Sequence, residues 1–331
     1  MNKNRYFRIF TNLLLVVSFF SLSACGIGEL NAPTPASQLI KTQAQVLTPT
    51  NITEPGSGET RIREIDGMEQ AYIPESSFMM GSTDEEIDWA ISQPWCPGCI
   101  REWFKDEQPV HEVYLDAYWI DKYEVSNAQY AQCVVAGVCD PPEFNFLSTQ
   151  TSYYENPEFA NYPVVYVSWF DAQYYCSWAE GRLPTEAEWE FAARGSDGRI
   201  YPWGSKLDAS KVNYCDSNCP FEWKDTAGND GYEYTAPVNS FITGANPFGV
   251  LNMGGNVYEW VADWIGEYTG ETQQNPVGSI DREFRVLRGG SWHHDPWTLR
   301  AADRVGRAPE FTEDWLGFRC VLQHDSGESL P

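Results

Sequence analysis

The stretch from residue 249 to residue 260 constrains the fold more than any other segment of the chain. It combines a side-chain amide, two glycines, a carboxylate and a large aromatic residue, namely Asn252, Gly254, Gly255, Glu259 and Trp260. Glycine lets the backbone turn its carbonyls inward without a Cβ clash. An amide oxygen, backbone carbonyls and a carboxylate together suit Ca²⁺, which takes about 6–8 oxygen ligands. The alternative is a glycine turn that leads into a strand and buries Trp260, with Asn252 and Glu259 in solvent. This stretch taken alone favours the alternative.

The rest of the composition favours an irregular, loop-rich fold of one large or two modest domains. The chain has 331 residues with 14 Trp, 26 Gly and 21 Pro, and it has no long apolar helical run in its folded part. Its formal net charge of −25 argues against nucleic acid and anionic membrane surfaces as partners. An acidic chain suits an exported protein and bound calcium, although most of these carboxylates serve solubility.

The first 24 residues are typical of a lipoprotein signal peptide. A basic start is followed by an apolar run, residues 9–22, that is too short to span a bilayer comfortably. The run ends in Leu22-Ser23-Ala24-Cys25-Gly26, which resembles a bacterial lipobox with Cys25 as the lipidated residue. An ordinary cleaved signal with a chance cysteine is the alternative. We therefore expect export and a lipid anchor in the membrane of the cell envelope or at the cell surface.

Composition divides the remaining chain into three parts. Residues 25–65 are rich in Pro and Thr and predict a flexible tether. Residues 66–324 predict the folded domain, and residues 325–331 a short tail. Within the domain, residues 72–74 and 78–81 are expected to form short strands, and residues 109–123 a strand pair.

Three capping boxes predict three helices. Each box pairs a serine or threonine with an acid or amide three residues later, and each helix ends near a glycine. The pairs are Ser126 with Gln129, Ser168 with Asp171, and Thr185 with Glu188, and the expected ends are Gly137, Gly181 and Gly195.

Nine cysteines leave one without a partner, and Cys25 is the natural odd member. Cys96 and Cys99 form a C-x-x-C motif. A redox role would need a thioredoxin-like unit around it, and a zinc site would need a second such motif. We therefore expect a local disulfide between Cys96 and Cys99.

The third predicted helix lies in a segment, residues 181–195, that resembles the signature of the formylglycine-generating enzyme (sulfatase-modifying factor) family. Further matches follow in family order, at residues 80–81, 118–127, 163–169, 201–204, 252–260, 288–291 and 317–320. The resemblance covers residues 66–324. It implies an α+β fold, an elaborated C-type-lectin-like domain with little regular secondary structure.

The resemblance also implies two structural calcium sites and one long-range disulfide. The first site would use Asn213, Tyr214, Asp230 and Tyr232, and the second Asn252, Gly255, Val257 and Glu259. Cys176 and Cys320 match the long-range family disulfide. Independently of the resemblance, Cys133 and Cys139, and Cys215 and Cys219, are close enough in sequence to predict two short-loop disulfides.

Enzymes of this family oxidise a substrate cysteine with copper held by two cysteines, three and eight residues after the Ser of a Gly-Gly-Ser motif. Counting from Ser291 gives His294 and Leu299, and no cysteine lies between Cys219 and Cys320. Two thiolates suit Cu(I), and an imidazole with a leucine does not, so no copper is expected. A second family disulfide is lost as well, because Ala193 and Arg304 stand at its two positions.

The loop after Ser291 is the candidate functional groove, formed by Ser291, Trp292, His293, His294, Asp295 and Trp297. Adjacent histidines diverge in extended chain, so we expect a polar groove lining rather than a metal cluster at His293, His294 and Asp295. The favoured function is a calcium-stabilised module that binds a peptide or a glycan. The alternatives are a sulfatase-type or other metal-dependent oxidase, and a purely structural envelope protein. The expected partner is a peptide, a glycan or an envelope protein.

Overall fold

The computed structural model describes residues 54–147, 150–280 and 283–324. The predicted signal peptide, the lipidation residue Cys25, the predicted tail and most of the predicted tether lie outside these residues. Within them, no helix combines the length and the apolar character needed to cross a membrane.

Two four-stranded sheets carry most of the strand pairing. The first has the order β1 (Thr60–Ile62), β2 (Glu69–Ile73), β5 (Tyr118–Asp121) and β13 (Val321–Gln323). The second has the order β11 (Arg304–Arg307), β10 (Arg285–Arg288), β8 (Tyr258–Trp264) and β12 (Leu316–Phe318). Only the β8–β12 pair in this second sheet is parallel, and β8 is its longest strand. The stretch 249–260 therefore leads into a central strand, and Trp260 is fully buried as the turn-and-strand alternative predicts.

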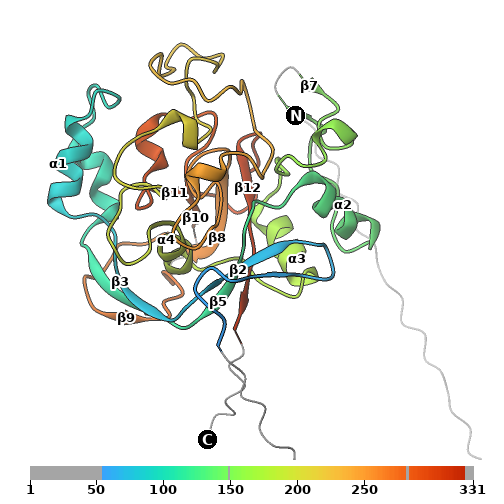
Figure 1. Ribbon diagram of the computed structural model, residues 1–331, viewed down its shortest axis with the longest axis horizontal. Coiled ribbons are helices and arrows are strands. Elements are labelled where there is room, and N and C mark those ends of the chain that lie inside the picture. Colours follow the sequence, from blue (N-terminus) through green and yellow to red (C-terminus); the bar gives the residue numbers. More distant parts are fainter. Residues whose placement is uncertain (1–53, 148–149, 281–282, 325–331) are drawn as a thin grey trace, which may run out of the picture. The chain divides into compact units, whose positions relative to one another are not determined.

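Smaller sheets and short helices complete the domain (Figure 1). A three-stranded sheet has the order β3 (Ser76–Met80), β4 (His111–Leu115) and β9 (Gln273–Gln274), and β6 (Phe146–Leu147) pairs with β7 (Gln150–Thr151). The α-helices are α1 (Asp84–Ser92), α2 (Asn127–Val135), α3 (Trp169–Trp178) and α4 (Glu186–Arg194). The 3₁₀ helices are η1 (Arg101–Glu107), η2 (Pro157–Phe159), η3 (Ala209–Lys211), η4 (Ile242–Gly244) and η5 (Pro296–Leu299).

The three predicted capping boxes are confirmed at the starts of α2, α3 and α4. In each, the Ser or Thr side chain accepts from the third backbone N–H, and the third side chain accepts from the cap backbone. A fourth box, Thr83 with Glu86, starts α1 and was not predicted. The predicted helix ends are confirmed as well, because Gly137 directly follows the C-cap Ala136 of α2 and Gly195 is itself the C-cap of α4. The helix α3 has its C-cap at Ala179, two residues before Gly181.

Two predictions about strands need correction. Residues 109–123 contain two strands, but β4 pairs with β3 and β9, whereas β5 pairs with β2 and β13. Both strands contribute apolar residues to the same core cluster, but the backbone of each finds its hydrogen-bond partners in other segments of the chain. The domain also starts before residue 66, since β1 pairs with β2 and Arg63 is buried against Asp66 and Asp121. Because β1 is only three residues long and contains polar residues, the composition of this segment did not distinguish it from the predicted tether.

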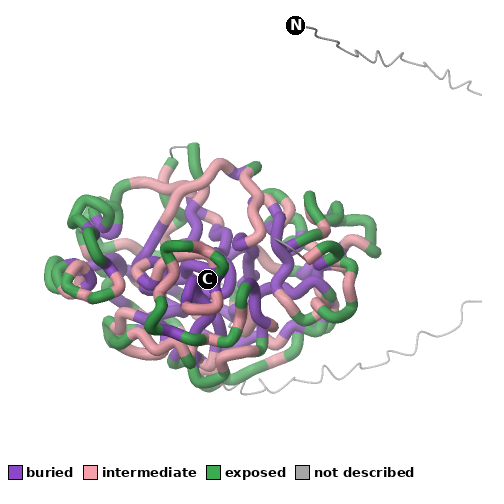
Figure 2. The backbone as a smooth tube through the Cα atoms, turned by 90° about the horizontal axis from the view of Figure 1, so that it is seen from above, coloured by how far each residue is buried: buried purple, intermediate pink, exposed green. Residues whose placement is uncertain are grey.

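The core consists of two main clusters of buried residues, and the exposed residues lie around the outside of the domain, in loops and in short helices (Figure 2). Trp260 belongs to the first cluster and Trp189 of α4 to the second. All four predicted disulfides are present, joining Cys96 to Cys99, Cys133 to Cys139, Cys176 to Cys320 and Cys215 to Cys219. The longest-range of these bonds ties α3 to the segment between β12 and β13.

Candidate functional site

The loop after β10 places an imidazole and an aliphatic side chain where the family resemblance would put two cysteines. The hydroxyl of Ser291 lies 2.6 Å from Nδ1 of His294, and the His294 N–H donates to the Ser291 carbonyl at 3.0 Å. Burial, and then the electrostatic effects of the neighbouring His293 and Arg307, lower the pKa of His294 to about 3. His294 is therefore a neutral ring at physiological pH, held by a fully buried serine.

Leu299 is packed into the core. It is fully buried and lies in an apolar cluster with Tyr201, Val212 and Tyr214. Every cysteine in the described part of the chain is in a disulfide, so this loop has no thiolate within reach. The residues at the two positions do not fit copper bound as a thiolate pair.

Around His293 lies a group of rings that we call the His293 cluster, consisting of Phe221, Trp223, Trp292, His293 and Trp315. Phe221 and Trp223 stack with their ring centres 4.5 Å apart and their planes within 2°. The Phe221 ring centre is also 4.5 Å from that of His293, and Trp223 Nε1 donates to the His293 carbonyl at 3.3 Å. Trp223 is 51% exposed, so the stacked pair presents an open aromatic face.

One polar atom of the cluster has no partner. The His293 Nδ1 atom is buried and makes no hydrogen bond within the described chain. Burial lowers the pKa of His293, so the ring is neutral and one of its nitrogens is an acceptor. The cluster thus offers a broad apolar face with one unsatisfied imidazole nitrogen.

The structure separates the last two predicted groove residues from the His293 cluster. Trp297 packs instead against Trp103 and Phe104, with ring centres 5.9 Å and 6.1 Å away. Asp295 precedes η5, and its carbonyl accepts from the Thr298 N–H and hydroxyl. The cause is the short helix η5, which turns the chain after His294. In the described ranges no group of three or more His, Cys, Asp or Glu side chains could hold a metal ion, so His293, His294 and Asp295 do not form such a group.

Sequence reasoning missed Phe221, Trp223 and Trp315 as parts of this site. Phe221 and Trp223 directly follow the Cys215–Cys219 loop, which is held to the candidate groove because the Cys215 N–H donates to the His294 carbonyl at 3.2 Å. Trp315 comes from the turn before β12, and its ring centre lies 4.7 Å from that of His294. The sequence showed that the chain is rich in tryptophan, but not which of its aromatic residues meet in the fold.

The first predicted calcium set comes together around Asp230. The Asp230 carboxylate accepts from the N–H groups of Tyr214 at 3.0 Å and Tyr232 at 2.8 Å. The adjacent Asn213 is buried, and its side-chain oxygen has no hydrogen-bond partner among the described residues. A second acid, the fully buried Asp216, accepts from the Asp230 N–H and was not predicted. Burial, together with the Asp216 charge, raises the pKa of Asp230 to about 7.

The second set has a different arrangement, since its carboxylate is already paired. The Arg319 guanidinium donates to both Glu259 oxygens at 2.6 Å and 2.7 Å, and Trp189 Nε1 donates to one of them at 2.8 Å. Asn252 is buried rather than solvated, and its amide donates to Glu124 at 2.9 Å. The backbone is turned rather than extended, with φ values of 54° at Asn252 and 86° at Gly255.

Gly255 is required for packing at this point. A Cβ there would lie 2.3 Å from the Asn213 carbonyl oxygen, and the positive φ disfavours any other residue. The remaining predicted member, Val257, is a fully buried core residue. Since Glu259 is held by Arg319, the second set does not fit a cation as well as the first.

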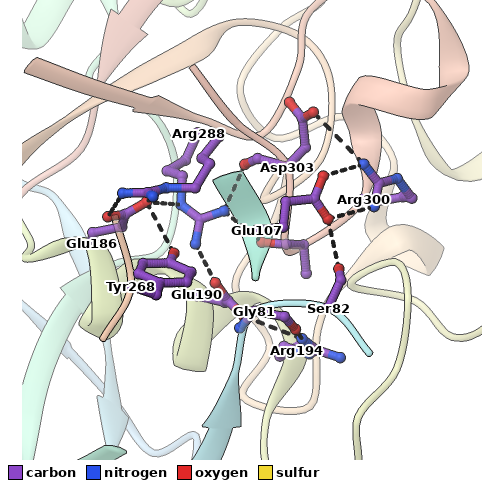
Figure 3. A network of polar contacts seen from close by, with 12 residues as sticks. Gly81, Ser82, Glu107, Glu186, Glu190, Arg194, Tyr268, Arg288, Arg300 and Asp303 are labelled. Carbon is purple, nitrogen blue, oxygen red and sulfur yellow. Dashed lines mark hydrogen bonds and ion pairs between the residues drawn. The ribbon is translucent and has the colours of Figure 1, made fainter. Parts of the chain in front are cut away.

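Behind the loop lies a buried network of charged side chains (Figure 3). Arg300 donates to both oxygens of Glu107 at 2.6 Å and 2.8 Å, and Arg288 pairs with Glu190 of α4. Arg304, at one position of the lost family disulfide, donates twice to Glu186 at 2.7 Å. This ion pair joins β11 to α4, the two elements that carry the positions of the lost disulfide.

The chain matches the model of the Sulfatase-modifying factor enzyme 1-like domain over residues 58–324. It is 32% identical over 294 residues to the mouse formylglycine-generating enzyme, covering 76% of this chain and 74% of that one. It is 40% identical over 169 residues to the bovine inactive C-alpha-formylglycine-generating enzyme 2, covering 48% and 50% of the two chains.

Two further similarities concern proteins with other names. The chain is 34% identical over 236 residues, 67% of its length, to the serine/threonine-protein kinase pkn1 of Chlamydia caviae, but it spans only 35% of that protein. Its structure resembles that of PvdO from Pseudomonas aeruginosa with a TM-score of 0.64 and 27% identity, covering 82% of this chain and all of that one. Together, the match over the folded domain and the shared fold show that the chain belongs to the sulfatase-modifying factor (formylglycine-generating enzyme) family.

Proposed function

We propose that this chain is a binding module of the family that does not oxidise cysteine, and that it holds a peptide segment against the His293 cluster. The observation that carries the proposal concerns the two positions where copper ligation needs thiolates, because His294 is paired with Ser291 at the first and Leu299 is buried in an apolar cluster at the second. The relative named as inactive supports the view that the family fold persists without oxidase activity.

The chemistry of the cluster favours a peptide over a glycan. The open face is formed by the stacked pair of Phe221 and Trp223, and the unpartnered polar atom beside it, His293 Nδ1, is buried and not accessible to a ligand. An apolar side chain of a peptide can therefore cover the rings without leaving a polar group of its own unpaired. A sugar carries several hydroxyl groups, each of which would need a partner.

We further propose one structural calcium ion, at the first predicted set only. The buried Asn213 oxygen without a partner and the two acids Asp216 and Asp230 fit an oxygen-seeking cation. The ion would fasten the loop between η3 and η4, which has almost no regular structure. The bound ion would thereby restrain the same loop that carries Phe221 and Trp223 of the His293 cluster.

The location of the module is also a proposal. The lipobox-like segment ending at Cys25 supports a lipid anchor, with residues 25–59 as the tether before β1. An envelope or extracellular polypeptide is then the natural source of the peptide ligand.

A substitution at the open aromatic face tests the binding role. Peptides selected from a displayed random library against the wild-type domain are expected to bind Trp223→Ala roughly tenfold more weakly, because a well-covered aromatic contact contributes about 1–2 kcal/mol. Affinity is measured by isothermal titration calorimetry. Trp103→Ala is a matched control, since Trp103 is also 51% exposed but lies in another cluster. Equal binding by both variants and wild type would contradict the proposal, as would selection of glycans instead of peptides on parallel arrays.

A further inference from the structure

A cavity of about 240 Å³ lies beside the start of α4 and shares no residue with the His293 cluster. It is lined by residues of β3, β4, α4, β8 and β11 and by the loops on either side of β9. Three of its polar side chains, His111, Glu186 and Asp263, are each only 3% exposed. The cavity is therefore built from core side chains, and it is not an acidic cluster on the surface.

The charged pair in the wall of this cavity is already neutralised. Arg304 donates to both oxygens of Glu186 at 2.7 Å, and the Tyr268 hydroxyl donates to Glu186 at 3.4 Å (Figure 3). The further acid Glu267 is exposed, so water and salt screen its charge. The buried walls thus offer neither a free cation to an anionic ligand nor an unpaired Glu186 carboxylate to a cationic one.

His111 contributes a hydrogen-bond acceptor without a partner. Its Nδ1 atom lies 3.2 Å from the Pro109 carbonyl oxygen, which can only accept, so Nδ1 carries the proton in the neutral ring. The other nitrogen, Nε2, is then an acceptor, and it makes no hydrogen bond with any residue that the structure describes. The Tyr268 ring, with its centre 4.7 Å away, holds the imidazole in place. His111 is therefore a buried polar side chain in the cavity wall that still needs a donor.

Two donors line the same cavity. The Asp263 carboxyl group accepts from the Glu186 N–H at 2.9 Å and forms no ion pair with a cation in the described ranges. Burial, and then the Glu186 charge, raise the pKa of Asp263 to about 8, so the carboxyl group is largely protonated at neutral pH and its O–H can donate. The N–H of Ala187, in the first turn of α4, finds no acceptor among the described residues.

A neutral amide matches this set of partners. Its carbonyl oxygen can accept two hydrogen bonds, from the Asp263 O–H and the Ala187 N–H, and its N–H can donate to His111 Nε2. Leaving any of these buried groups unpaired is costly, so an uncharged ligand with both functions is favoured. Met80 and Pro276 add apolar surface to the lining, against which a methyl group can pack.

We propose that the cavity binds the acetamido group of an N-acetylated amino sugar. The rim favours a sugar as the carrier of this group, because the partly exposed Gln273 and the exposed Thr269 are neutral and polar. The Gln273 amide lies 3.4 Å from the Thr269 hydroxyl, and both side chains keep capacity for hydrogen bonds to ring hydroxyl groups. An asparagine or glutamine side chain would bring the amide without the methyl group. This site is independent of the peptide-binding role proposed for the His293 cluster.

The test compares sugars that differ only in the group at the acetamido position. The full-length protein is titrated with methyl N-acetyl-β-glucosaminide, with methyl β-glucoside and with methyl β-glucosaminide, and binding is followed by saturation-transfer NMR and calorimetry. The acetamido sugar is expected to bind at least tenfold more tightly than the hydroxyl and amine analogues, because only the amide fills both donor and acceptor roles. N-methylacetamide supplies the amide without the ring and is expected to bind at least tenfold more weakly than the acetamido sugar.

Variants of the cavity separate binding from folding, which is checked for each by its melting temperature. His111→Phe keeps a ring against Tyr268 but removes the acceptor, and it is expected to lose at least tenfold in affinity. His324→Phe is the matched control, since His324 pairs with Glu54 outside the cavity, and it should bind as wild type does.

The pH dependence gives a readout that does not rely on the His111 variant. Between about pH 7 and pH 9 the wild type is expected to lose affinity as Asp263 ionises and its donor disappears, whereas the affinity of Asp263→Asn should not change with pH. The charged groups that face Asp263 are Glu186 and Glu188 of α4 and Arg304 of β11, and histidine is mostly neutral in this window. Equal affinity for the glucoside, tighter binding of the amine or of N-methylacetamide, or unchanged binding by a folded His111→Phe would overturn the proposal.

Discussion

Replacing Arg319 with methionine is expected to lower the free energy of unfolding by about 3–5 kcal/mol, the usual cost of leaving a buried charge without its partner. Arg319 is fully buried, and it donates to both oxygens of Glu259. It also donates to the carbonyls of Asp121 at 3.0 Å and Leu251 at 2.9 Å. Burial and the Glu259 charge raise the pKa of Glu124 to about 7, and the positive charge of Arg319 limits that rise. Without Arg319, two buried acids would lie close together with no cation.

Denaturant unfolding followed by far-UV circular dichroism measures this effect. The matched control is Arg101→Met, because Arg101 forms exposed ion pairs with Asp84 and Asp88 that should contribute less than about 1 kcal/mol. Arg319→Lys keeps the charge but loses the bidentate hydrogen bonds to Glu259. Its loss of unfolding free energy should therefore lie between the losses of the other two variants. A loss below about 1 kcal/mol for Arg319→Met would contradict the view that this ion pair holds the turn at residues 252–256 on β8.

Removal of calcium is the second large effect. At free calcium near 100 times the dissociation constant, a single bound ion adds about 2.7 kcal/mol to the stability of the folded state. Chelation should therefore lower the melting temperature by several degrees, and added calcium should restore it. The expected ligands, Asn213, Asp216 and Asp230, hold a loop that has few other constraints besides the Cys215–Cys219 disulfide.

The calcium response should disappear in Asp230→Asn and persist in Asp208→Asn. The Asp208 carboxylate caps η3 by accepting from the Ser210 N–H and hydroxyl, and it serves as the control acid. The same melting temperature for wild type with and without chelator would count against the site. A response retained by Asp230→Asn would place the ion elsewhere.

Local patterns made much of the fold predictable from the sequence. Capping boxes depend on residues three apart, so the starts of α2, α3 and α4 could be located directly. The three short-loop disulfides also followed from spacing, and the long-range pair from the family resemblance. The family itself was evident because many short motifs occur in order.

Contacts between distant segments could not be predicted in the same way. Glu259 was assigned to a cation because its neighbours are oxygen donors, but its partner Arg319 lies 60 residues away. The strands β4 and β5 were expected to pair because they are adjacent, although each has its partners elsewhere. Trp297 was grouped with His293 by proximity in sequence, and η5 carries it to Trp103. In each case a tertiary partner outweighed the local pattern.

The most direct test of the proposed function is the fate of a cysteine peptide. The purified protein is loaded with copper, its metal content is determined, and it is incubated with a Cys-x-Pro-x-Arg peptide that is then analysed by mass spectrometry. With His294 held by Ser291 and Leu299 buried, we predict no stoichiometric copper and no conversion of cysteine to formylglycine. Formation of formylglycine above the level of a copper-only control would contradict the account.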